Sequence, residues 1–195
     1  MNKDIKASLD SVAERLLYGV MSHSEMVQYY SFLSLPHYAN EHGHHYQEES
    51  ETYHKYVRFL IGKYNYVYRQ GAISAPAKVP ASWNGAEIFN VSDGDRKKYV
   101  AYGLKQWLDW EEVTLDVFQE AANTLYMHGE LFAFKMISRM IESVESEIDD
   151  IKQYITRRSA LINSNEVLEE DKYEEPVKKE EQIAPVTPET INVVQ

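Results

Sequence analysis

The chain has 195 residues, 44% of them hydrophobic and 26% charged, which is enough for one domain with a hydrophobic core. It has no cysteine, which excludes a disulfide scaffold, thiolate zinc sites, iron–sulfur clusters and cysteine nucleophiles. The formal charge of -11 argues against a nucleic-acid partner, because nucleic-acid binders concentrate positive charge. No stretch approaches the roughly 18 apolar residues of a membrane span, and the N-terminal residues lead into an amphipathic segment rather than a signal core. We therefore expect a cytoplasmic protein with no membrane partner.

Apolar residues recur at helical spacing through most of the chain and predict four long helices. These are expected at about residues 4–35, 44–69 and 92–127, followed by a fourth helix built on the apolar stripe of 137–155. Pro36 and the polar stretch 37–43 interrupt the pattern between the first two helices. After the third helix, Gly129 stands where a glycine usually ends a helix.

The lengths of the connections predict the topology. Short turns join the first helix to the second and the third to the fourth, whereas residues 70–91 contain Gly71, Pro76 and Pro80 and show little helical period. A connection of this length can run back along a bundle. We therefore expect residues 1–160 to form an all-α antiparallel four-helix bundle with one long crossover.

The C-terminal residues 161–195 have a different composition. Residues 165–195 hold nine acidic and three basic side chains and few large apolar ones. We expect a flexible acidic tail. Its more apolar end, 183–195, is compatible with a docking peptide for a protein partner, but we favour a tail with no binding role.

Two helical segments carry side chains at the spacing of metal ligands. Glu51 and His54 form a Glu-x-x-His motif, and Glu142 and Glu145 repeat the spacing with Glu in place of His. Residues three apart share one helical face, so each pair can reach one metal ion. A solvated helix face is the alternative for both pairs.

The other two helices each carry an acid within an apolar face. Glu25 and Glu111 both have apolar residues one and two turns away on either side. An acid in such a stripe is costly unless it is paired or binds a cation. Glu112 competes with Glu111, but its neighbours Asp116 and Gln119 assign it to the solvent side.

These motifs are expected to meet at one level of the bundle, because residues equidistant from the turn of a hairpin lie at one height. The midpoint between Glu25 and Glu51 is Tyr38, and the midpoint for the acids of the last two helices falls at 126–127. Both midpoints lie beside turn signals. A dinuclear carboxylate centre has this pattern: two helices each contribute one Glu, and the other two contribute Glu-x-x-His or, in this chain, Glu-x-x-Glu. Its donors suit iron, with manganese or zinc as alternatives.

Four further histidines cluster around the expected first turn: His37, His42, His44 and His45. They would bind a metal at the surface or simply form an exposed polar turn, and we favour the second interpretation. His23 receives no functional assignment.

Two stretches resemble known motifs. The run from Glu25 to Ser34 resembles the first-helix motif of the ferritin-like di-iron carboxylate superfamily, closest to the non-haem ferritins. The pattern of Gln47, Glu51 and His54 resembles the second-helix motif of the same proteins. The chain departs from them in having Phe32 where a tyrosine is common and in lacking a clear fifth helix after the bundle.

The resemblance implies a ferritin-like fold and a ferroxidase centre that binds two iron ions. The residues it implies are Glu25, Glu51, His54 and Glu111 as catalytic ligands, with Glu142 and Glu145 as further metal ligands. The expected activity is oxidation of Fe(II) to Fe(III) by O2 or H2O2 for iron storage or detoxification, in a homo-oligomer. The alternatives are another di-iron or di-manganese enzyme of the peroxidase or hydroxylase type, or a non-catalytic ferritin-like interaction protein recruited through its tail.

Overall fold

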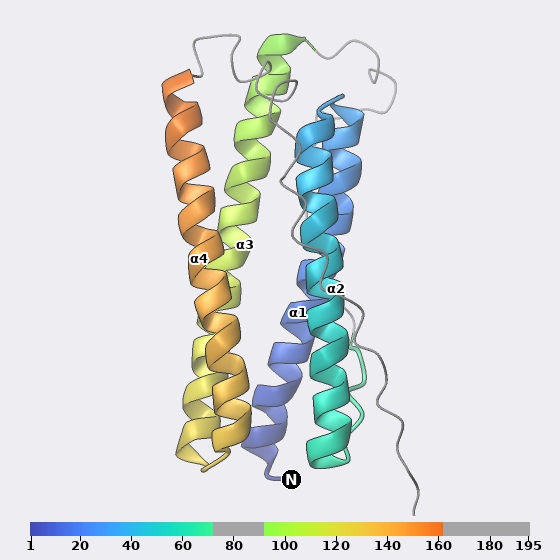
Figure 1. The fold of residues 1–195 in the computed structure, drawn as a ribbon, viewed down its shortest axis with the longest axis vertical. Coiled ribbons are helices and arrows are strands. Elements are labelled where there is room, and N and C mark those ends of the chain that lie inside the picture. The colour runs from blue at the N-terminus through green and yellow to red at the C-terminus, as the bar shows by residue number, and fades with distance from the viewer. Residues whose placement is uncertain (72–91, 162–195) are drawn as a thin grey trace, which may run out of the picture.

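The computed structural model describes residues 1–71 and 92–161, and this part of the chain is all-helical, without strands. Its four helices are α1 (Lys3–Phe32), α2 (Pro36–Tyr64), α3 (Asp93–Met127) and α4 (Leu131–Leu161). The helices α1 and α2 form one antiparallel hairpin, α3 and α4 form the other, and α1 packs against α3 (Figure 1). The expected four-helix bundle is confirmed. The expected crossover and acidic tail fall mostly on residues 72–91 and 162–195, outside the described residues.

Helix direction distinguishes this bundle from a simple up-down arrangement. Both α2 and α3 end at the end of the bundle where α1 begins, so these two helices run in the same direction (Figure 1). No helix in the described ranges is both long enough and apolar enough to cross a membrane.

The first turn is tighter than the sequence pattern predicts. Ser34 adopts a left-handed φ of 58°, and the amide of Leu35 donates to the carbonyl of Tyr30, which closes a Schellman motif. Pro36 then occupies the first turn of α2, where its missing N–H is not needed. The predicted interruption at 37–43 is therefore wrong, as is the predicted helix start at His44.

The second turn agrees with the prediction. The helix α3 begins at the cap Ser92, whose hydroxyl accepts from the amide of Asp95, and it ends before Gly129, which has a φ of 75°. The amide of Glu130 donates to the carbonyl of Leu125, so this end is also a Schellman motif. Most of the stripe on α4 faces the core, with Ile137, Val144, Ile148 and Ile151 buried.

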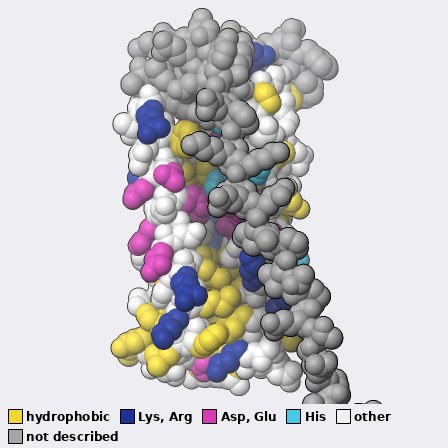
Figure 2. Space-filling model, viewed as in Figure 1, with side chains coloured by type: hydrophobic (Ala, Val, Ile, Leu, Met, Phe, Trp, Pro, Cys, Tyr) yellow, Lys and Arg dark blue, Asp and Glu magenta, His cyan; other side chains and the backbone are white. Residues whose placement is uncertain are grey.

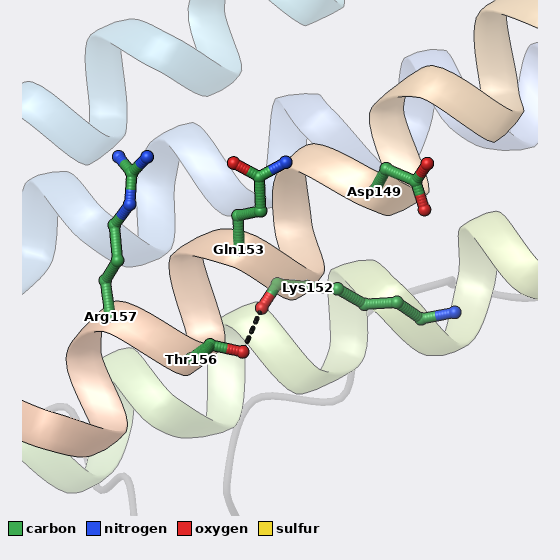
Figure 3. A pocket seen from close by; sticks show the side chains of 5 residues that line it. All are labelled: Asp149, Lys152, Gln153, Thr156 and Arg157. Carbon is green, nitrogen blue, oxygen red and sulfur yellow. Dashed lines mark hydrogen bonds between the residues drawn. The ribbon is translucent and has the colours of Figure 1, made fainter.

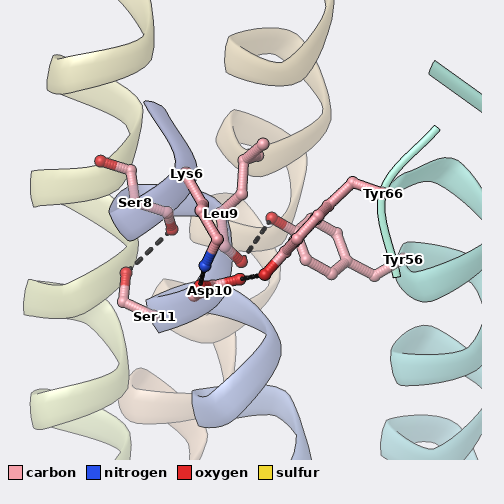
Figure 4. Close-up of polar contacts among 7 residues, drawn as sticks. All are labelled: Lys6, Ser8, Leu9, Asp10, Ser11, Tyr56 and Tyr66. Carbon is pink, nitrogen blue, oxygen red and sulfur yellow. Dashed lines mark hydrogen bonds and ion pairs between the residues drawn. The ribbon is translucent and has the colours of Figure 1, made fainter. Parts of the chain in front are cut away.

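Polar contacts join the start of α1 to the end of α2. The hydroxyl of Tyr56 donates to the carbonyl of Leu9 at 3.1 Å, and the hydroxyl of Tyr66 donates to Asp10 at 2.6 Å (Figure 4). Lys6 pairs with the same carboxylate. These contacts tie the two helices together at the end of the bundle opposite the first turn.

Close packing of α1 against α3 depends on Gly103. A Cβ at this position would press into the hydroxyl of Tyr30 and lie 2.9 Å from Cε of Met26. Gly62, near the end of α2, has nothing within 4 Å of its Cβ position.

We predict that Gly103→Ala and Gly62→Ala change stability in opposite directions. The first should lower the free energy of unfolding by about 1–3 kcal/mol because it overpacks the interface. The second should raise it by up to about 1 kcal/mol because alanine favours a helix over glycine. Urea denaturation of both variants measures this, and a stabilised Gly103→Ala would contradict the packing described.

Candidate metal centre

The two turns determine which residues face each other across the hairpins. His23 precedes Ser34 by as many residues as His45 follows it, so both side chains lie at one height. Glu111 and Glu147 are likewise equally far from the glycine of the second turn. The two levels meet, because Nδ1 of His45 lies 3.3 Å from a carboxylate oxygen of Glu147. One layer of the bundle thus collects histidine and glutamate from all four helices.

Three histidines lie together in this layer. His23 and His42 are fully buried and their Nδ1 atoms are 2.9 Å apart, so one ring donates its proton to the other. His45 stacks on His23 with ring centroids 5.1 Å apart. Trp107 and Trp110 meet His23 edge-on, and both indoles are buried. The cluster therefore has an apolar wall on the side of α3.

Two carboxylates accept hydrogen bonds from these indoles. Nε1 of Trp110 donates to Glu111, which is only 2% exposed. Nε1 of Trp107 donates to Glu147 at 3.2 Å. The tryptophans therefore orient acids from two different helices toward the same layer.

The third carboxylate, Glu49, fits because its neighbour on α1 has no side chain. A Cβ at Gly19 would lie 3.1 Å from Cδ of Glu49. Oε2 of Glu49 is buried and has no hydrogen-bond partner among the described residues. At this level α1 has a glycine, and the space that Gly19 leaves is occupied by the side chain of Glu49.

Burial dominates the protonation of all three acids. It raises the pKa of Glu49 to about 8, with a further contribution from repulsion by Glu111. It raises the pKa of Glu111 to about 7, against the opposing effect of the Trp110 hydrogen bond. It also raises the pKa of Glu147 well above its usual value, and Glu111 and Glu49 add repulsion. Without a nearby cation the layer favours protonated carboxyl groups.

A half-buried cation lies beside two of these acids. Nε of Arg15 donates to the hydroxyl of Thr114 at 2.7 Å, and its guanidinium also donates to the carbonyl of Trp110. The guanidinium carbon lies 4.2 Å above the ring of Tyr18. Arg15 is thus anchored to α3 at the residue directly before Glu111 and at the residue three positions after it.

Two hollows between α2 and α4 lead to the layer from outside. Their volumes are about 510 and 330 Å³, and their shared lining residues are His45, Glu48, Ser143 and Glu147. Histidine and acidic side chains are visible at mid-height on this face (Figure 2). The helices α2 and α4 are not in close backbone contact, which leaves room for these hollows.

A third hollow follows the outer face of α4 and shares Gln153 and Arg157 with the larger of the two. Its side chains extend in different directions from the helix, and the one hydrogen bond drawn runs from the hydroxyl of Thr156 to the carbonyl of Lys152 (Figure 3). It lies outside the histidine and carboxylate layer.

The layer contains only one of the six ligands expected from the sequence, Glu111. Glu25 is half-buried, and the exposed members are Glu51, His54, Glu142 and Glu145. Glu51 is 72% exposed and pairs with Lys55 on its own helix. The six-residue ligand set therefore stays a prediction that the described contacts do not bring together.

Burial separates Glu111 from its competitor. Glu112 is exposed and pairs with Lys152 at 3.1 Å, whereas Glu111 points into the core. The sequence prediction about which of the two faces solvent is confirmed.

The structure corrects the prediction for the histidines near the first turn. The expectation of an exposed polar turn is wrong for His42, which is buried, and for His45, which is half-buried. The missed signal is a regular inward stripe on α2 that becomes visible once the helix starts at Pro36. Its members are Tyr38, His42, His45, Glu49, Tyr56 and Leu60.

The layer fits a bound transition-metal ion. In the described part of the chain, one group of potential ligands has donor atoms that all lie within 4.8 Å of one another, and it consists of His23, His45 and Glu147. Nε2 of His23 is buried without a partner, while its Nδ1 meets His42. A ligating histidine usually has its second nitrogen hydrogen-bonded in this way. Burial also lowers the pKa of His23 well below its usual value, which keeps the ring neutral and able to bind a metal.

Comparisons with known proteins leave the family open. The chain matches no protein-family model and no curated protein sequence.

The pKa of Glu49 predicts a pH dependence of stability in the metal-free protein. The folded state holds this proton up to about pH 8, while the unfolded state releases it near pH 4.5, so stability falls as pH rises through that window. The contribution is at most about 1.4 kcal/mol per pH unit. Relative to the wild type, Glu49→Gln should therefore gain stability progressively from pH 5 to pH 8.

Urea denaturation with a chelator present measures this gain. The control is Glu48→Gln, since Glu48 is 77% exposed and its substitution should change stability by less than about 0.5 kcal/mol throughout. A gain for Glu49→Gln that does not vary with pH would contradict the burial of this carboxyl group.

Proposed function

We propose that the protein is a ferritin-like ferroxidase that binds Fe(II) within its four-helix bundle and oxidises it to Fe(III). The observation that carries this proposal is the group formed by the buried His23 and the half-buried His45 and Glu147, with an unpartnered nitrogen on His23. Imidazole and carboxylate donors without thiolates suit iron, and manganese or zinc would also bind.

The arrangement of the helices supports the ferritin-like part of the proposal. The bundle consists of two antiparallel hairpins, and the consecutive helices α2 and α3 run in the same direction. A chain with this arrangement must connect the end of α2 to the start of α3 at the opposite end of the bundle. The sequence resemblance of the first two helices points the same way. A homo-oligomer and recruitment of a protein partner through residues 183–195 belong to the same proposal.

Two ligand assignments compete within the proposal. The sequence motifs favour Glu25, Glu51, His54, Glu111, Glu142 and Glu145. The contacts favour His23, His45 and Glu147 with Glu49 and Glu111 beside them. We adopt the second assignment, because Glu51 and His54 are exposed, whereas every member of the second group is buried or half-buried.

The chain's own residues supply binding, orientation and access. The hollows beside Glu48 admit cations from solvent to His45 and Glu147. The indoles of Trp107 and Trp110 hold two of the carboxylates and limit water on the α3 side. The overall reaction takes one electron from each of two Fe(II) ions, and one O2 accepts both electrons with two protons to give H2O2.

A second function is favoured by the smaller hollow. Its volume of about 330 Å³ could hold a small organic molecule against Glu147, and it is lined in part by Leu16, Phe118 and Met140. Two histidines and one carboxylate are also the ligand set of iron enzymes that oxidise organic substrates. Such an enzyme would be of the hydroxylase or peroxidase type.

We predict that His45→Ala combined with Glu147→Gln abolishes Fe(II) binding and oxidation, because it removes two of the three clustered donors. The matched control is Glu51→Gln combined with His54→Ala, which changes the same residue types on the exposed face and should keep wild-type activity. Anaerobic Fe(II) titration followed by exposure to air measures both binding and oxidation.

The outcomes separate the assignments and the functions. Loss of activity only in the control variant would favour the ligands expected from sequence. Repeated oxidation of excess Fe(II) supports a ferroxidase, whereas oxidation of a single bound equivalent supports the second function. Unchanged Fe(II) binding in both variants would contradict the proposed centre.

A further inference from the structure

The layer divides into two unequal halves. Donor atoms of His23, His45 and Glu147 lie close enough together to share one ion. Glu49 lines the smaller hollow together with His45 and Glu147. Glu111 accepts from Trp110, whose ring meets His23. Neither acid joins the group of three. A dinuclear centre would need these two acids to hold a second ion.

Arg15 already provides a cation for that second half. Its guanidinium donates to the carbonyl of Trp110, the residue directly before Glu111 on α3, and to the hydroxyl of Thr114, three residues after it. Attraction from Glu111 and Glu49 opposes the effect of burial, which lowers the pKa of Arg15. Glu147 is not among the acids that act on Arg15 in this way.

The charges agree with this division. A metal ion that binds here would displace the protons that burial keeps on these three carboxyl groups. The three carboxylates would then carry three negative charges, and the guanidinium cancels one of them. One divalent ion then neutralises the layer, whereas two would leave an excess of positive charge inside the bundle. Uncompensated buried charge is strongly unfavourable, so the layer has room for one divalent ion in electrostatic terms.

We infer that the centre binds one divalent metal ion, at His23, His45 and Glu147, and that Arg15 takes the place of a second ion beside Glu49 and Glu111. This rests on the proposed metal centre and departs from the two-ion site implied by the resemblance to ferritin-like proteins. Arg15 is a positioning residue, because it acts through the two carboxylates.

Titration of the metal-free full chain with Co(II), followed by native mass spectrometry, tests the inference. The wild type should bind one ion per chain. Arg15→Met removes the charge but keeps the length of the side chain, and it should raise the number to two. Arg15→Lys keeps the charge and should bind one. The control Arg58→Met alters an exposed arginine of α2 and should also bind one.

Each other outcome overturns the inference. Two ions in the wild type would do so while leaving the metal centre standing, and no ion would overturn both. A folded Arg15→Met that still binds one ion would remove the role of Arg15. If that variant does not fold, Glu49→Gln gives the answer, because it should keep its single ion, and loss of the ion would assign Glu49 to the metal.

Discussion

Charge buried inside the bundle is the constraint on which the rest of this structure depends. Glu49, Glu111 and Glu147 occupy one layer of the bundle, where they are largely shielded from water. A buried carboxylate is tolerated when it is protonated, hydrogen-bonded or next to a cation. The protein uses each of these means. Indoles donate to two of the acids, the half-buried guanidinium of Arg15 attracts two, and the pKa of all three is raised. A metal ion would complete this set, which is the reason for proposing a metal site in this layer.

The turns decide which residues reach that layer. Ser34, whose backbone is in the left-handed region, closes the first hairpin two residues after the end of α1, so the second helix starts at Pro36. Placing the turn at Tyr38 displaces it by four residues from Ser34 and moves the facing partner by eight. With the turn centred on Ser34, the residue level with Glu25 is Gly43. With the turn centred on Tyr38, it would be Glu51. An error of one helical turn at a loop is therefore enough to select a different set of ligands.

The local sequence was sufficient to predict four helices, the start of the third at residue 92, its end before Gly129 and the buried side of Glu111. The level of the site could not be predicted in the same way, because it depends on the geometry of two turns. Proline was misleading, since it ends a helix in one context and starts one in another. The role of Arg15 was also hidden, because its partners Thr114 and Trp110 are remote in sequence and are brought near only by the packing of α1 against α3.

Anomalous X-ray diffraction from crystals of the full chain grown with Co(II) tests the central claim most directly, because it locates the metal without relying on activity. The account predicts one anomalous peak per chain, in contact with His23, His45 and Glu147 and separated from Arg15 by Glu49 and Glu111. A peak at Glu51 and His54, or a metal-free core with His23 still lacking a partner, would contradict it.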